Sequence, residues 1–208
     1  MEQNNKELLL SGLIKLEVPD AEQKADILAM YCDRVLEANG RFNLLGNVTE
    51  YDMVVKHILD SVSGYKLVGT GKKVLDIGTG SGILSIAALL LGAESAFGVD
   101  IDPLSVKTAR ENGIKNGYKE PQLTFVNGDL ADKVSGKYDI VIANIVADVI
   151  IRLCDNVTDF VKEGGVFITS GIIDTRADEV IEAITAAGFS IAARYDDGGW
   201  VSLAAILN

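Results

Sequence analysis

The segment from residue 74 to residue 86 reads VLDIGTGSGILSI, and it decides the fold. Its first residues suit a buried β-strand, three glycines follow between positions 78 and 82, and an apolar run typical of a helix comes next. A glycine-rich turn between a strand and a helix is typical of a site for a nucleotide-like ligand. A dinucleotide in that site predicts an oxidoreductase, whereas another adenosine compound predicts a different reaction.

The glycine spacing does not fit a dinucleotide. The dinucleotide fingerprint is G-x-G-x-x-G/A, and counted from Gly78 its third small position falls on Ile83. An acidic residue, Asp76, stands two positions before the first glycine. A carboxylate there repels a pyrophosphate but suits a ligand that carries an ammonium group and no phosphates. S-adenosylmethionine is such a ligand, and a nicotinamide-dependent oxidoreductase stays as the alternative from another class.

Strand-like and helix-like segments alternate after residue 71, which predicts a parallel sheet with helices on both faces. Residues 191–195 and 200–207, joined by Asp-Asp-Gly-Gly, predict a closing hairpin with an antiparallel strand at or near one edge. The expected fold is an α/β, Rossmann-like, doubly wound and mostly parallel sheet of seven strands, in a domain over 71–208. The other strands are expected at 73–77, 95–100, 122–127, 138–143 and 164–170, and the helices at 81–91, 103–117, 146–161 and 175–187.

Residues 1–70 predict a helical extension before this domain. Asn39-Gly40 is expected to end its second helix, and Thr49 is expected to cap the third. The only histidine, His57, lies on the apolar side of the third helix, where a structural histidine is favoured over a catalytic base. Helices are expected at 4–16, 21–39 and 49–61.

Composition limits the class of partner and the compartment. Over 208 residues, 48% hydrophobic content allows a sizeable core, and a net charge of −11 disfavours a broad nucleic-acid-binding surface. The longest apolar run, near 83–91, is too short to cross a bilayer, and the N-terminus lacks a secretory pattern. Cys32 and Cys154 stand far apart in apolar contexts, so we expect no disulfide framework, no metal site and a cytoplasmic location.

Acidic residues lie at the ends of three successive strands of the predicted sheet. After Asp76, Asp100 ends the second strand, 20 residues beyond Gly80, where a carboxylate can accept hydrogen bonds from both ribose hydroxyls. Asp129 follows the third strand and can accept from an adenine amino group. A lone Asp at a strand end is often a helix cap or turn residue. Three of them at the edge where such sheets bind ligands favour a binding site.

The segments DIGTGSG, VDIDP, GD and AN together resemble the class I S-adenosylmethionine-dependent methyltransferases. Over residues 72–207, VLDIGTGSGILSIAALLLGAESAFGVDIDPLSVKTARENGIKNG, YDIVIANIVADVI, GGVFITSGI and GGWVSLAAIL resemble the catalytic domain of the ribosomal protein L11 methyltransferase family. The resemblance implies S-adenosylmethionine as methyl donor, S-adenosylhomocysteine as product, no metal, and an amino nitrogen of a ribosomal protein as acceptor. It also implies a cofactor site formed by Asp76, Gly78, Thr79, Gly80, Gly82, Asp100, Ile101, Asp129, Leu130 and Asn144.

Asn144, at the end of the fourth strand, opens the matching N-I-V-A segment. Methyl transfer from a sulfonium is an in-line displacement, so the enzyme mainly aligns donor and acceptor. The side-chain carbonyl of Asn144 can accept from the acceptor's N–H, and the family's segment lines this site, so Asn144 and the neighbouring Ile145 are the predicted catalytic residues. The alternative for Asn144 is a cap of the helix that starts near Val146. Tyr195 and Trp200, on the final hairpin, are expected to be packing residues.

The N-terminal part does not continue this resemblance. The L11 methyltransferase family usually begins with a small α/β domain that recognises its substrate, and no strand pattern before residue 70 predicts one. Instead, EANGRFNLLGNVTEYDMVVKHILDSVSGY resembles the helical N-terminus of the RsmG (GidB) family of 16S ribosomal RNA guanine-N7 methyltransferases, through Arg41–Leu44 and His57-x-x-Asp60-Ser61. Leu45 departs from that pattern, because the family tends to have Thr there. The two halves indicate a natural fusion or an engineered chimera, with RNA methylation and cofactor binding without turnover as alternatives.

Overall fold

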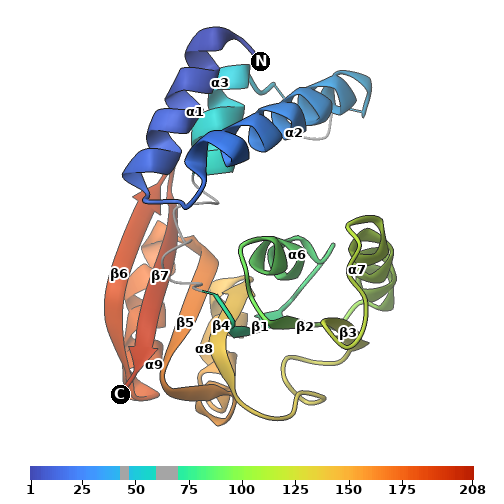
Figure 1. Cartoon of the computed structure of the whole chain (residues 1–208). Coiled ribbons are helices and arrows are strands. Elements are labelled where there is room, and N and C mark those ends of the chain that lie inside the picture. Colours follow the sequence, from blue (N-terminus) through green and yellow to red (C-terminus); the bar gives the residue numbers. More distant parts are fainter. Residues whose placement is uncertain (43–46, 60–69) are drawn as a thin grey trace. The chain divides into compact units, whose positions relative to one another are not determined.

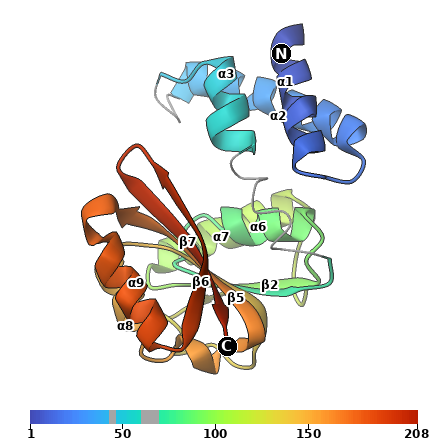
Figure 2. The same ribbon diagram turned by 90° about the vertical axis from the view of Figure 1, so that its left-hand side faces the viewer.

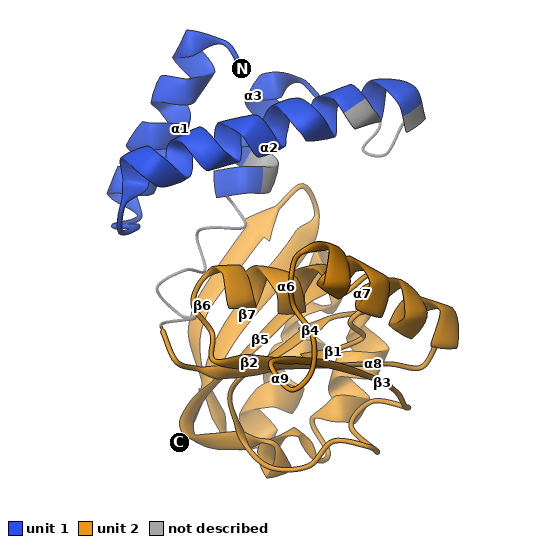
Figure 3. Ribbon diagram, turned by 45° about the vertical axis from the view of Figure 1, so that its right-hand side comes forward, with its two compact units in different colours: residues 1–67 blue, residues 68–208 orange. Residues whose placement is uncertain are grey.

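The structure, a computed structural model, describes residues 1–42, 47–59 and 70–208 (Figure 1). Its contacts divide the chain into two compact units, residues 1–67 and 68–208 (Figure 3). Over the described ranges, no helix combines the length and the apolarity that crossing a membrane requires.

The second unit is built on a seven-stranded sheet of order β3-β2-β1-β4-β5-β7-β6. The strands from β3 to β5 pair in parallel, while β7 pairs antiparallel with both β5 and β6, which confirms the predicted fold class. A dinucleotide-binding sheet has the order 3-2-1-4-5-6, without an antiparallel strand between its last two strands. The strands are β1 (Lys73–Ile77), β2 (Ser95–Asp100), β3 (Leu123–Asn127), β4 (Tyr138–Asn144), β5 (Val161–Ile173), β6 (Phe189–Asp197) and β7 (Trp200–Leu207).

Helices cover both faces of this sheet (Figures 2 and 3). α6 (Ile83–Leu90) and α7 (Pro103–Lys115) pack on one face, and α8 (Ala147–Leu153) and α9 (Ala177–Ala186) pack on the other. Val74 of β1 belongs to the first of these cores, while the next residue, Leu75, belongs to the second. Both faces of β1 are buried, which explains why its sequence is almost continuously apolar instead of alternating.

The described residues of the first unit form three consecutive helical segments and a core of their own. Thr49 caps the third segment as predicted: its Oγ1 accepts from the Asp52 backbone N at 3.1 Å, and the Asp52 carboxylate accepts from the Thr49 N at 3.3 Å. The segments are α1 (Gln3–Lys15), α2 (Ala21–Phe42), and α3 (Glu50–Asp52) continued by the π-helix η1 (Met53–Leu59). The core is formed by Leu9, Leu13, Val18, Ala25, Cys32, Met53, Val54 and Ile58.

Two predicted helix ends are wrong. α2 continues through Gly40 to Phe42, because Gly40 does not take up the left-handed backbone that would end a helix. The helix predicted over 146–161 ends at Leu153, and a short 3₁₀ turn, η2 (Val157–Asp159), separates it from β5. β5 starts at Val161, earlier than predicted, because that residue is fully buried and pairs with β4.

The prediction for the final hairpin also needs correction. Tyr195 and Trp200 are 63% and 56% exposed, so they are not core packing residues. Both lie near the turn of the β6–β7 hairpin. Another short 3₁₀ turn, η3 (Asp174–Arg176), joins β5 to α9.

Candidate functional site

The buried carboxylate of Asp76 accepts hydrogen bonds from the glycine-rich turn and from the helix that follows it. Its side chain is fully buried, and its Oδ2 accepts from Thr79 Oγ1 at 2.7 Å, from Ser85 Oγ at 2.7 Å and from the Ser85 backbone N at 3.2 Å. Ser85 lies in the first turn of α6. One carboxylate therefore joins the strand, the turn and the helix that follows it.

The second oxygen of this carboxylate, Asp76 Oδ1, is buried and has no hydrogen-bond partner among the described residues. Burial raises the pKa of Asp76 above its usual range and outweighs the hydrogen bonds from Thr79 and Ser85, which lower it. The negative charge of Asp100 acts in the same direction as burial. A buried acceptor without a donor is destabilising, so a donor supplied by a water would be favourable here. Because Asp76 is fully buried, it can support a ligand only indirectly, by holding the turn, and a proton on the carboxyl, which the raised pKa favours, is another way to satisfy this oxygen.

Asp100, at the end of β2, is the second carboxylate that accepts a hydrogen bond from the same turn. Its Oδ2 accepts from the Gly80 N at 2.8 Å, and its Oδ1 accepts from the Asp102 N at 2.9 Å. A carboxylate has about four lone-pair sites, so Asp100 can still accept hydrogen bonds from a ligand. Ile101, next in the chain, is 68% exposed, and it therefore offers an apolar surface beside that carboxylate.

Most backbone amides of the turn already have partners. The N–H groups of Gly78 and Thr79 both donate to the Val99 carbonyl, at 2.9 and 3.0 Å. Those of Gly80 and Ser85 donate to the two carboxylates described above. A pyrophosphate needs free amides at a helix N-terminus, and here carboxylates occupy those of Gly80 and Ser85. The geometry therefore disfavours a dinucleotide, and it adds these occupied amides to the charge repulsion that the sequence suggested.

The small residue that close packing between the turn and α7 requires is Gly82, so position 83 can carry the large side chain of Ile83. Gly82 has φ +81°, and a Cβ added to it would lie 2.8 Å from Phe125 Cζ and 3.0 Å from Ala109 Cβ. The close approach between the turn and α7 therefore occurs at Gly82. The side chain of Ile83 points away from this contact and is 58% exposed.

Asp129 and Leu130 follow β3 at the same edge of the sheet. Asp129 Oδ1 accepts from Arg152 Nη2 of α8 at 2.8 Å, and both side chains are more than half exposed. The second carboxylate oxygen of Asp129 accepts no hydrogen bond from another described residue. Leu130 has φ +48°, which is uncommon for a non-glycine residue and marks a strained backbone at this predicted site.

Asn144 and Ile145 lie next to the glycine turn. A Cβ added to Gly78 would overlap Ile145 Cγ2, so Ile145 packs directly on the turn. Asn144 is exposed, and its carboxamide makes no hydrogen bond to another described residue. The N-cap of α8 is Val146, without a side-chain hydrogen bond, so the capping alternative for Asn144 is wrong. The carboxamide is thus free to bind a ligand.

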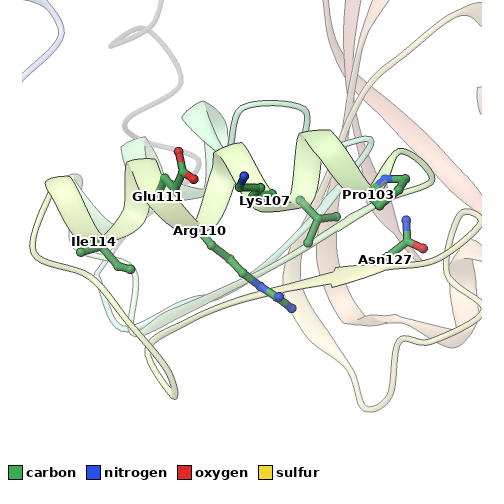
Figure 4. A pocket seen from close by; sticks show the side chains of 7 residues that line it. Pro103, Lys107, Arg110, Glu111, Ile114 and Asn127 are labelled. Carbon is green, nitrogen blue, oxygen red and sulfur yellow. The ribbon is translucent and has the colours of Figure 1, made fainter.

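A groove elsewhere in this unit does not coincide with the predicted site. It runs along α7 with a volume of about 290 Å³ (Figure 4), and none of the predicted site residues lines it. Arg110 reaches across it, with Nη2 2.6 Å and Nε 3.2 Å from the Phe125 carbonyl of β3, the edge strand. Arg110 thereby covers an exposed sheet edge, a structural role. The groove is lined by Pro103, Val106, Lys107, Arg110, Glu111, Ile114 and Asn127.

The role of Ser85 was not predicted from the sequence, and the structural role predicted for His57 stays a prediction. The signal for Ser85 is a single polar residue inside an apolar helix, where burial forces it to find a partner. The side chain of His57 lies outside the described residues, as do Asn43, Leu44, Leu45, Asp60 and Ser61. Where the structure describes the chain, no three His, Cys, Asp or Glu side chains gather in a way that could hold a metal ion.

A family model for the ribosomal protein L11 methyltransferase (PrmA) matches residues 53–207. The chain belongs to the ribosomal protein L11 methyltransferase family. The match starts within η1, before the predicted limit at residue 72, and ends where the resemblance ended. The likeness of the N-terminal helices to the RsmG family stays a prediction.

Relatives in this family match about two thirds of the chain. The ribosomal protein L11 methyltransferase of Desulforamulus reducens is 47% identical over 141 residues, which are 68% of this chain and 46% of that protein. The one of Bacillus subtilis is 45% identical over 140 residues, 67% of this chain and 45% of that protein. The chain therefore spans a little under half of the length of these relatives.

Solved structures agree with the fold. A ribosomal protein L11 methylase from Lactobacillus delbrueckii subsp. bulgaricus matches with a TM-score of 0.65 and 32% identity, over 71% of this chain and 78% of that one. SMU.776, a putative methyltransferase complexed with S-adenosylhomocysteine (SAH), matches with a TM-score of 0.60 over 72% of this chain and 49% of that one. Its identity is 15%, so it shows the shared fold alone.

Replacing Asp76 with Asn is expected to change how stability depends on pH. Because the folded-state pKa of Asp76 is raised, the stability it contributes is complete below its unfolded pKa, near ~3.9, and is lost as pH rises through the folded value. The melting temperature of Asp76→Asn minus that of the wild type should therefore increase from about pH 4 towards pH 7. Thermal unfolding followed by circular dichroism across this range measures it.

Asp139 offers a control because its pKa is shifted in the direction opposite to that of Asp76. Burial would raise its pKa, but hydrogen bonds from the Lys73 backbone N and from Lys162 outweigh burial and lower it. Stability from Asp139 is present above its unfolded pKa and lost as pH falls through the folded one, so Asp139→Asn should be most destabilising near neutrality. A pH-independent difference for Asp76→Asn would contradict the buried-carboxylate account.

Proposed function

We propose that this chain is an S-adenosylmethionine-dependent methyltransferase of the L11 type, acting on amino nitrogens of a ribosomal protein. The observation that carries the proposal is the packing of Ile145 on Gly78. It brings Asn144, a free carboxamide, to the turn that Asp76 and Asp100 hold. This packing supports a donor site and an acceptor site that would lie next to each other, as an in-line displacement requires.

The residues have separate parts in this reaction. When bound, S-adenosylmethionine supplies a methyl group on a positively charged sulfur. Asp100 would accept from the ribose hydroxyls and Asp129 from the adenine amino group, while the turn would seat the amino-acid end near Asp76. Asn144 would accept from the N–H of the acceptor through its side-chain carbonyl, and Ile145 would keep water from the reacting atoms.

The acceptor must be a neutral amine, since a protonated nitrogen has no lone pair. A free lysine titrates near ~10.4, so the amine first loses a proton to solvent. Its lone pair would then accept the methyl group that the sulfonium supplies, and the donor would leave as a neutral thioether with the electron pair of the broken S–C bond. The rate at saturating donor should accordingly rise with pH over the neutral range.

The partner follows from the family and from charge. The relatives are named for ribosomal protein L11, and we propose an L11-like protein, met in the cytoplasm, as the substrate of this chain. A net charge of −11 favours a basic protein over RNA. The alternative acceptor is guanine N7 in 16S ribosomal RNA, and the resemblance of the first unit to the RsmG family is what supports it. The same resemblance would indicate a fusion or chimera of two methyltransferases.

Two measurements test the proposal. Calorimetry with SAH and with NADH separates a methyltransferase from an oxidoreductase, and binding of NADH without binding of SAH would overturn our assignment. Transfer of a tritiated methyl group to purified L11 or to 30S subunits then identifies the acceptor. Incorporation into L11 supports the proposal, incorporation into 30S RNA supports the alternative, and SAH binding without incorporation into either leaves a protein that binds the cofactor without turnover.

A further inference from the structure

β5 contains one extra residue where it passes Asn144. In its antiparallel pairing with β7, Thr169 pairs with Leu203 and Ile172 pairs with Val201, so three steps along β5 correspond to two along β7. Such an insertion is a β-bulge, which commonly has a glycine in the left-handed region and re-aims nearby side chains. Gly171, within this bulge, has φ +77°.

The bulge lies directly against the predicted acceptor segment. The carbonyl of Ser170 accepts from the Ile145 N at 3.2 Å. A Cβ added to Gly171 would lie 2.9 Å from Asn144 Oδ1, 3.0 Å from the Ile145 carbonyl oxygen and 3.3 Å from the Ile145 N. These distances are shorter than ordinary van der Waals contacts. The backbone of Ile145 cannot yield easily because Ile145 also packs on the glycine turn, so the Asn144 carboxamide is the group that would move.

We propose that Gly171 is a positioning residue for methyl transfer. Because Gly171 has no side chain, the Asn144 carboxamide can occupy the space beside it, and from there the carboxamide orients the acceptor amine. This inference rests on the proposed function, which assigns the acceptor N–H to Asn144. Any side chain at position 171 displaces the carboxamide from the acceptor. The donor site, held by Asp76 and Asp100, stays intact because neither residue contacts the bulge through a hydrogen bond.

Gly164 provides a matched control in the same strand. It also has a positive φ, +69°, but a Cβ added there meets nothing within 4 Å. Alanine at Gly164 therefore introduces left-handed strain without a clash, whereas alanine at Gly171 introduces both. The difference between the two variants isolates the clash at Gly171, which involves the Asn144 carboxamide and the Ile145 backbone, and the Asn144→Ala background separates these two contributions.

The test compares Gly171→Ala with Gly164→Ala in the full chain. Gly164→Ala should melt about 2–8 °C below the wild type, the effect of left-handed strain in a protein of this size, and Gly171→Ala should melt lower still because it adds the clash. Only Gly171→Ala should lower kcat for L11 methylation, by about tenfold or more, with the Kd for SAH within about twofold of the wild type. In an Asn144→Ala background, adding Gly171→Ala should lower kcat no further, because the displaced group is already absent.

A second readout does not depend on activity. The side-chain amide signal of Asn144 in a ¹⁵N–¹H NMR spectrum should shift in Gly171→Ala and stay unchanged in Gly164→Ala. If the wild type shows no methyl transfer, the proposed function fails and this spectrum still decides the place of Gly171. Where Gly171→Ala does not fold, Gly171→Asn tests the same point, because asparagine tolerates the left-handed region and still carries a Cβ. An unmoved Asn144 signal, or equal kcat losses in both glycine variants, would overturn the proposal.

Discussion

Replacing Asn144 with alanine is expected to lower kcat for methyl transfer about a hundredfold while the affinity for SAH stays unchanged. The carboxamide is exposed, makes no hydrogen bond to another described residue and stands beside the glycine turn through Ile145. Its removal leaves the turn in place but no longer aligns the acceptor, and a misplacement of about 1 Å costs about 10²-fold in rate. Single-turnover methyl transfer and SAH calorimetry on the same preparation measure both quantities.

Asn144→Asp is the informative companion variant. It keeps an oxygen that accepts from the acceptor N–H and nearly preserves the shape of the side chain, so it should retain much more activity than Asn144→Ala. Neither variant should change the melting temperature strongly, since Asn144 caps no helix and is not buried. Full activity of Asn144→Ala on a demonstrated substrate would show that the acceptor is oriented by another group.

Replacing Asp100 with alanine is expected to weaken SAH binding by about a hundredfold or more. The carboxylate holds the turn through the Gly80 N at 2.8 Å and is the group we assign to the ribose hydroxyls. Hydrogen bonds to a charged group contribute about 1.5–3 kcal/mol each, and ~1.4 kcal/mol corresponds to a factor of ten. Loss of two ribose contacts alone therefore accounts for the expected weakening, which calorimetry with SAH measures.

Asp129→Ala serves as the comparison for Asp100→Ala. Asp129 is more than half exposed and shares its carboxylate with Arg152, so its single predicted contact should contribute about tenfold or less. If the two variants bound SAH equally well, the assignment of Asp100 to the ribose would be wrong. A variant Asp100→Asn, which keeps an acceptor but loses the charge, should fall between Asp100→Ala and the wild type.

Much of the fold was predictable because its signals are local. The strand–turn–helix unit around Gly78 follows from apolar runs and from a backbone that glycine alone adopts readily, and β1 and β2 have the predicted bounds. The region after α8 was not predictable in the same way. Residues 154–160 are compatible with a helix by composition, but pairing of Val161 with β4 starts a strand there, and such pairing depends on residues distant in sequence.

The sequence by itself determined most strand and helix segments, the glycine turn and the three acidic residues at successive strand ends, since each depends on neighbours in the chain. Tertiary structure alone decided how Asp76 is used: folding places it beneath the turn, where Ser85 and Thr79 bind one oxygen and the other stays without a described partner. It also decided that Gly171 meets Asn144. That contact requires the register among β4, β5 and β7 together with a bulge, and no local pattern in the chain encodes this register.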